Sequence, residues 1–203
     1  MTAEVKNDKW SHESSKPGWN LLFCSTQDTT EMMIDMACTI INREFSHEFV
    51  TSLSQLLKKH TDVKKLRMCV EIRRCTIFDV GKMIDTISGY KQTNRLENVT
   101  VTISGYCTLV ACMMMIGTAS KGCKQSTQRC ILEMDKLAVS EAGDIKILKA
   151  GIRQLEIHDE MCNNLLRACG IEKSIDELCG NGTVYTAEEM LTLGLIDKIT
   201  NII

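Results

Sequence analysis

Short apolar runs alternate along this chain with longer segments of helical periodicity, and this alternation restricts the fold more than any other feature. Leu66–Ile72 and Val99–Ile103 are predicted strands, because apolar side chains recur at about every second position. Between them, Ile77–Ile87 spaces its apolar residues for one stripe of a helix. Strands that alternate with helices of about ten residues form parallel β-α-β units with right-handed crossovers. The sequence therefore predicts an α/β fold.

The same patterns predict the remaining elements. Strands are expected at Trp19–Cys24, Ala37–Ile41 and Arg129–Met134, and helices at Ser46–His60, Cys107–Ile116, 144–169 and Ser174–Cys179. The segment 144–169 is the longest, and its outer side is charged. A single proline and 12 glycines favour regular elements over long linkers. No internal repeat or low-complexity segment is visible.

The chain divides into a short polar segment and one long folded part. Residues 1–18 are polar and contain Pro17-Gly18, which indicates a mobile arm or an edge extension. Residues 19–203 are expected to form a single domain, since a chain of 203 residues can bury a sizeable core without staples.

Composition and charge argue against nucleic-acid partners, membrane association and export. The net charge of −2, from 24 basic and 26 acidic residues, gives no electrostatic reason to expect nucleic acid or an anionic membrane. The longest apolar run, Leu109–Ile116, is about half of the ~18 residues that a membrane span needs. The amino-terminal residues lack a basic-then-apolar signal. These features predict a cytoplasmic protein.

The 11 cysteines are scattered, odd in number and contain no C-x-x-C pair. A chain of this size needs no disulfide framework, so we expect reduced thiols that act as small core residues. No histidine has metal-ligand spacing to a cysteine. We therefore expect no metal and no cofactor.

The carboxyl-terminal segment carries the clearest local signals. Thr186 can cap a short helix, and Glu189 three residues later completes a capping box. Gly194 can adopt the left-handed backbone conformation that ends a helix. Leu195–Ile199 has the alternating pattern of a final strand. The residue pattern resembles the carboxyl-terminal motif S-A-x-E-A-x-x-x-G-L-V-D of the Clp protease proteolytic subunit (ClpP) and of the related crotonase superfamily.

Three further segments extend the resemblance to ClpP over about three-quarters of the chain. Phe78–Ile87 resembles the family's helix T-A-G-x-x-I-Y-D-T-I. Val101–Tyr106 resembles the strand and glycine that precede the nucleophile. Ala119–Gly122 resembles the turn G-A-K-G that follows the nucleophile helix. The resemblance implies ClpP/crotonase-like stacked β-α-β units, a handle-like helix at about 144–169 and a short carboxyl-terminal helix-strand unit. It also implies a ring-like homo-oligomer, because the handle of ClpP joins two rings.

The positions that carry catalysis in that family hold other residue types here. A serine peptidase needs a hydroxyl, a histidine base and two backbone amides for the oxyanion. The nucleophile position falls on Leu109, counted from Gly105, or on Val110, counted back from Gly122. The histidine position falls on Glu133 or, with one shift, on Met134. The resemblance thus implies that the catalytic triad is lost.

The segment that forms the oxyanion hole is also altered. ClpP has N-S-P-G-G there, whose glycines let bare backbone approach the substrate. This chain has Glu71-Ile-Arg-Arg-Cys75 instead, so that Arg73, Arg74 and Cys75 stand in the matching positions. These side chains would crowd and charge the cleft.

Three alternatives keep an active site. Cys112 lies between Ala and Met as the family's serine does, so it is an alternative candidate for the nucleophile. Ser104 or Ser120 with Lys121 would make a serine–lysine pair. A crotonase would need only two oxyanion amides and a carboxylate such as Glu133 or Glu71.

The prediction is therefore a catalytically inactive ClpP-like protein that acts through assembly, as a regulatory or structural subunit. The implied partners are further copies of the chain, a Clp protease subunit or its AAA+ unfoldase. A divergent ClpP-family peptidase, dependent on a serine or on Cys112, is the alternative.

Overall fold

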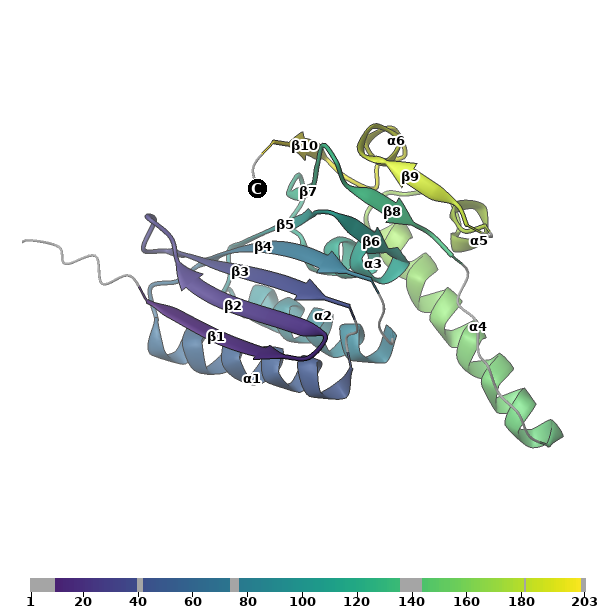
Figure 1. Ribbon diagram of the computed structural model, residues 1–203, viewed down its shortest axis with the longest axis horizontal. Coiled ribbons are helices and arrows are strands. Elements are labelled where there is room, and N and C mark those ends of the chain that lie inside the picture. Colours follow the sequence, from purple (N-terminus) through teal and green to yellow (C-terminus); the bar gives the residue numbers. More distant parts are fainter. Residues whose placement is uncertain (1–9, 40–41, 74–76, 136–143, 181, 202–203) are drawn as a thin grey trace, which may run out of the picture.

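The computed structural model describes residues 10–39, 42–73, 77–135, 144–180 and 182–201 (Figure 1). The strands within these ranges are β1 Ser11–Lys16, β2 Trp19–Ser25, β3 Glu31–Cys38, β4 Lys65–Ile72, β5 Asn98–Ile103, β6 Tyr106–Thr108, β7 Lys124–Thr127, β8 Ile131–Glu133, β9 Val184–Thr186 and β10 Lys198–Thr200. The helices are α1 Arg43–Lys59, α2 Ile77–Gln92, α3 Leu109–Thr118, α4 Ile145–Ala168, α5 Ile175–Leu178 and α6 Ala187–Thr192. The protein is thus a mixed α/β protein, as the sequence predicts.

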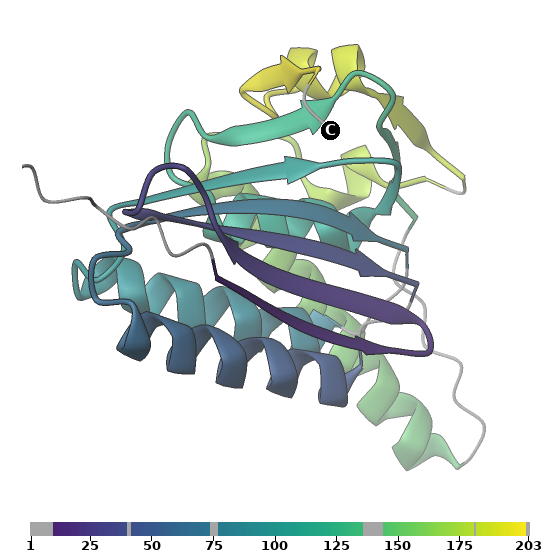
Figure 2. The same cartoon turned by 60° about the vertical axis from the view of Figure 1, so that its left-hand side comes forward.

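A seven-stranded sheet with the order β1-β2-β3-β4-β5-β7-β10 forms the centre of the molecule. Its strands β3, β4, β5, β7 and β10 run parallel, whereas β1 and β2 add an antiparallel hairpin at one edge. Helices α1 and α2 lie along one face of the strands β1–β4 (Figures 1 and 2). Alternate strand residues such as Phe23, Ile34 and Met68 are fully buried and form the core with Phe45 and Phe49 of α1.

A second, three-stranded sheet has the order β6-β8-β9. Its strands β6 and β8 are parallel, and β9 pairs with β8 in the antiparallel direction. Helix α3 follows β6 directly and contacts β5, β6, α2 and α4. The short sheet therefore lies at the start of α3, where the resemblance to ClpP locates the catalytic cleft.

Helix α4 leaves the body of the molecule, and its amino-terminal half projects away from it (Figure 1). Asp144 caps the helix and accepts hydrogen bonds from Lys146 N and Ile147 N at 2.9 and 3.1 Å, and Cys169 is the C-cap. These ends confirm the predicted segment 144–169. The capping box at Thr186 and the left-handed conformation of Gly194, with φ of +74°, are confirmed as well. The structure adds a capping box between Ser174 and Glu177 at the start of α5.

Several predicted boundaries are wrong. The strand expected at Ala37–Ile41 is β3, which begins at Glu31; residues 40–41 lie outside the described residues. Helix α1 begins after Asn42, whose side chain accepts from Phe45 N, so Ser46 is not the cap. Ser46 is instead buried and its hydroxyl donates to Asp79 at 3.2 Å.

The elements around α3 also differ from the prediction. Residues 106–108 form β6, and the helix expected at Cys107–Ile116 begins at Leu109. Strand β7 was not predicted, because its sequence Lys-Gln-Ser-Thr is polar and only four residues long. The strands expected at Arg129–Met134 and Leu195–Ile199 are shorter, at Ile131–Glu133 and Lys198–Thr200. Helix α2 continues five residues beyond Ile87, to Gln92.

The amino-terminal hairpin is held against helix α1. The prediction of a mobile arm over residues 1–18 is wrong for Ser11–Lys16, which pairs along its length with β2; residues 1–9 lie outside the described residues. The alternative of an edge extension describes this strand. Trp10 stacks on His60 with ring centroids 4.2 Å apart, and Trp19 packs edge-on against Phe45. Both tryptophans are thus used in local packing.

No helix in the described part of the chain combines the length and the apolar character that a membrane span needs.

Candidate functional site

The nucleophile position lies at the first turn of helix α3. Leu109 and Val110 are the first two residues of this helix, and their exposed fractions are 3% and 5%. Their side chains are part of the core, which explains why apolar residue types stand there. An apolar side chain offers no atom for nucleophilic attack.

The base position lies on strand β8, next to β6. Glu133 is opposite Thr108 in the parallel register, and its Oε2 accepts a hydrogen bond from the hydroxyl of Tyr106. This bond raises the pKa of the Tyr106 phenol, and partial desolvation and the charge of Glu133 add to the shift. The carboxylate is thus bonded to a phenol, whereas Met134 has no exposed surface. Tyr106 was missed as a site residue, since only the register of two strands brings it to Glu133.

The segment that would form the oxyanion hole holds an ion pair. Arg73 Nη2 lies 3.0 Å from Glu71 Oε1. Gly105, with φ of +64°, packs so closely on Glu71 that an added Cβ would lie 2.8 Å from the Glu71 Cδ. The Glu71–Arg73 ion pair therefore lies at the positions where ClpP has the exposed glycine backbone of its oxyanion hole. Arg74 and Cys75 lie outside the described residues.

A cleft of about 540 Å³ opens at the carboxyl ends of β4, β5, β7 and β10. Its lining is Glu71, Ser104, Gly105, Thr127, Gln128, Arg129, Thr200 and Asn201. Ligands of open α/β sheets bind at such edges. This lining includes hydroxyls, a carboxylate and one guanidinium but no histidine, so it lacks the base that a hydroxyl nucleophile requires.

Cys112 lies inside helix α3 with no exposed surface. Burial raises the pKa of its thiol well above the usual range. A cysteine nucleophile reacts as the thiolate, which needs a lowered pKa and access to the substrate. The surroundings of Cys112 provide neither, which argues against the cysteine peptidase alternative.

The positions of Ser120 and Lys121 in the fold argue against the serine–lysine alternative. The Ser120 hydroxyl accepts from Val99 N at 3.0 Å, at the amino-terminal end of strand β5. Ser104 lines the cleft at the carboxyl end of the same strand. Ser120 and its neighbour Lys121 thus lie at the opposite end of the sheet from the cleft, and their hydroxyl and amine do not face it.

A different group of residues has the types found in a catalytic triad but not the geometry. His12 Nε2 lies 3.1 Å from Ser52 Oγ and 3.9 Å from Glu48 Oε1, and the Ser52 hydroxyl donates to Glu48 at 3.2 Å. In a triad, the serine and the acid contact opposite nitrogens of the imidazole. Here both are nearest the same nitrogen, and Ser52 is 4% exposed in the middle of α1. This cluster attaches strand β1 to helix α1.

No group of three or more metal-ligating side chains lies within reach of one ion among the described residues. The described cysteines are all free thiols, and most are buried or half-buried. The thiols of Cys38 and Cys162, for example, have their pKa raised to about 12 by burial. Such protonated thiols act as packing groups.

Helix α4 presents a group of large apolar side chains at the surface. Ile145, Leu148 and Ile152, spaced by three and four residues, are 70%, 44% and 58% exposed. We call these three residues the α4 stripe. Ile147 and Ile157 are also exposed on this helix, at 44% and 37%. A run of large aliphatic side chains in water favours association.

The chain matches no protein-family model, and a comparison with curated proteins finds no match. Fold and surface together define a mixed α/β protein with a mostly parallel central sheet and a projecting amphipathic helix. The likeness to ClpP therefore stays a prediction from the sequence motifs.

Proposed function

We propose that this protein is a non-catalytic, ClpP-like assembly subunit that acts through association of helix α4. The observation that carries the proposal is the α4 stripe, which leaves three large aliphatic side chains in solvent. Each would remove apolar surface from water on binding, at about 25 cal/mol per Å² of area. An exposed apolar surface of this kind lowers the solubility of a protein, and a partner that covers the surface removes this effect.

The chemistry at the start of α3 supports the non-catalytic part of the proposal. An acyl-transfer site requires a nucleophile, a base in contact with it and donors for the oxyanion. At the matching positions this chain has buried Leu109 and Val110, a carboxylate bonded to Tyr106, and the Glu71–Arg73 ion pair. These side chains fill and cross-link the region.

The proposed partners are further copies of the chain, in a ring-like homo-oligomer. The resemblance to ClpP adds a Clp protease subunit and its AAA+ unfoldase as second partners. Both kinds of association would use a helix that projects from the body, because its stripe is reachable without any change in the sheet.

Light scattering coupled to size-exclusion chromatography tests the assembly. The wild-type protein is expected to elute as an oligomer at micromolar concentrations. Ile152→Glu adds a charge to the α4 stripe and is expected to shift the mass towards the monomer. Gln154→Glu adds the same charge on the opposite side of the helix and is expected to leave the mass unchanged. A wild-type protein that stays monomeric would overturn the proposal.

Hydrolysis of a mixed fluorogenic peptide library by the pure protein tests the absence of catalysis. We expect no turnover by the wild type, and none by Cys112→Ala. Turnover that disappears in the variant would instead identify a cysteine peptidase. Addition of an active ClpP ring and its unfoldase to the same assay measures regulation, as a change in the rate of that ring.

A further inference from the structure

The central sheet has one face that no described element covers over strands β2, β3 and β4 (Figures 1 and 2). Helices α1 and α2 occupy the opposite face. Leu22, Asp35 and Cys69 form a row across the three strands, because Leu22 pairs with Asp35 and Asp35 with Cys69. Cys24 and Met33 are paired in the adjacent row. We call these five residues the open-face patch.

Asp35 is the one acidic member of the open-face patch, and no cationic side chain among the described residues forms an ion pair with it. Partial burial against its neighbours raises the pKa of Asp35; the Met36 N–H opposes this shift, and the charge of Glu71 adds to it. The Asp35 side chain is exposed between Leu22 and Cys69, and it lacks a counter-charge among the described residues.

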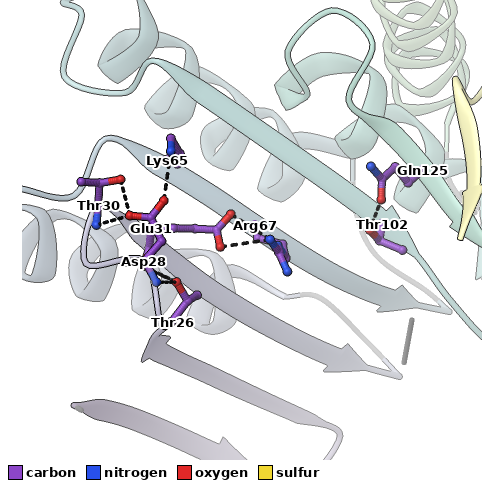
Figure 3. A network of polar contacts seen from close by, with 8 residues as sticks. All are labelled: Thr26, Asp28, Thr30, Glu31, Lys65, Arg67, Thr102 and Gln125. Atoms are coloured by element: carbon purple, nitrogen blue, oxygen red, sulfur yellow. Dashed lines mark hydrogen bonds and ion pairs between the residues drawn. The ribbon is translucent and has the colours of Figure 1, made fainter. Parts of the chain in front are cut away.

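The two arginines nearest the patch already have partners. Arg67 Nη2 lies 3.1 Å from Glu31 Oε2 and 3.2 Å from Glu31 Oε1, an arrangement that Figure 3 shows beside the Asp28–Lys65 pair. Arg73 is paired with Glu71. Asp35 is therefore available to a cationic side chain of another molecule.

The α4 stripe has the complementary chemistry. Lys149 follows Ile145 by four residues and lies beside the stripe, and Lys146 lies further around the same side. Neither lysine has an ion-pair partner in the described ranges, whereas Arg153 is paired with Glu156 at 2.9 Å. The helix thus combines large aliphatic side chains with free positive charge.

The two surfaces also match in size. The α4 stripe covers about 10 Å along the helix, at a rise of about 1.5 Å per residue from Ile145 to Ile152. The row from Leu22 to Cys69 covers two strand spacings, which is also about 10 Å. A helix laid across the sheet would place the stripe over the row.

We propose that the α4 stripe of one copy of this chain docks on the open-face patch of the next copy, with Lys149 against Asp35. The inference rests on the proposed assembly function and names its contact. The two surfaces belong to different parts of the molecule, so the contact is heterologous. Such contacts produce a closed ring when the rotation between copies closes, and a filament when it does not.

Charge reversal tests the contact by sedimentation equilibrium. Asp35→Lys and Lys149→Glu are each expected to weaken association by roughly tenfold or more, because each places like charges together. The double variant Asp35→Lys/Lys149→Glu restores opposite charges and is expected to recover most of the association. Asp62→Lys and Lys58→Glu are the matched controls, since both residues are exposed and lie outside the two surfaces.

The outcomes separate this inference from the proposed function. If Ile152→Glu abolishes assembly while Asp35→Lys and the double variant associate like the wild type, the sheet face is not the docking surface and only this inference is overturned. If the wild type is monomeric, both are overturned.

Carbodiimide coupling of the wild-type protein provides a second measurement that does not depend on the folding of any variant. The reagent joins a carboxylate and an amine in contact, forming an amide with loss of water. In a mixture of isotope-labelled and unlabelled protein, we expect a peptide linking Asp35 of one copy to Lys149 or Lys146 of another. Links that join only α4 to α4 would overturn the inference.

Discussion

Helices α3 and α4 contact each other, yet their surroundings are opposite. Nine of the ten residues of α3 are buried, whereas only three of the 24 residues of α4 are. In the ClpP-like register, α3 is the helix that would begin with the nucleophile, and here it serves as core. Helix α4 contributes little to the core and keeps large aliphatic side chains in solvent. Helix α3 therefore serves the packing of the core, whereas helix α4 is available for association.

The largest expected effect contrasts the two helices directly. Met114→Ala removes a fully buried side chain from α3 and is expected to lower the free energy of unfolding by about 2–5 kcal/mol, through lost burial and the remaining cavity. Leu148→Ala, on the α4 stripe, is expected to change the stability of the monomer by less than about 0.5 kcal/mol. Urea unfolding in dilute solution, followed by circular dichroism, measures both. Equal losses would mean that α4 is packed as α3 is.

The next effect concerns the turn that leads to α3. Gly105→Ala is expected to cost about 2–3 kcal/mol, because it combines an unfavourable positive φ with a Cβ that meets Glu71 at 2.8 Å. Gly170→Ala is the control for the backbone alone: its φ is +76°, but no atom lies within 4 Å of the added Cβ. It is expected to cost about 1 kcal/mol. Indistinguishable urea midpoints would show that Glu71 moves aside without cost.

A smaller effect is expected at the free end of α4. Asp144→Ala removes the side chain that accepts from Lys146 N and Ile147 N, which costs about 1 kcal/mol of helix stability. Because this end projects from the body, we expect local fraying and little change in global unfolding. Hydrogen exchange should therefore accelerate in the first turns of α4 only, and Asp144→Asn should restore most of the protection. A large fall in global stability would contradict a free helix end.

The smallest effect tests the chemistry beside α3. The hydrogen bond to Glu133 raises the pKa of Tyr106 above its ordinary value of about 10. The pair therefore stabilises the fold below the unfolded-state pKa, and this contribution is lost as the pH rises through the folded-state pKa. Glu133→Gln is expected to lower the pKa of Tyr106 towards 10. Ultraviolet difference spectra of tyrosine ionisation, wild type against variant, measure the shift. Superimposable titration curves would exclude the bond in solution.

Elements with strong local signals were predicted well. The segment 144–169 and the capping box at Thr186 depend on contacts between residues three or four apart, which the sequence displays directly. The strands Trp19–Cys24 and Leu66–Ile72 were found within one residue at each end, because their buried residues alternate. In the candidate site, the residue types at 109, 110, 133 and 134 could be assigned, but not their contacts.

Elements that depend on distant partners were not predicted. Strand β7 is polar, and it exists because β5 and β10 bond to it on either side. Strand β1 is almost wholly exposed, and only the alternative of an edge extension described it; β2 pairs with it across the turn at residues 17–18, and His12 contacts Ser52 of α1. No local pattern encodes the pairing of β7 or the contact between His12 and Ser52, since these partners lie in distant segments of the chain.

The sequence by itself determined the α/β class, the extent of the long helix and the residue types at positions 109, 110 and 133, because these depend on residue type and short-range spacing. Only the tertiary structure decided that Tyr106 bonds Glu133, that Glu71 packs under Gly105 and that Asp35, on an open sheet face, has no counter-charge within the described ranges. Each of these depends on strand register, which the hydrogen bonds between distant segments establish.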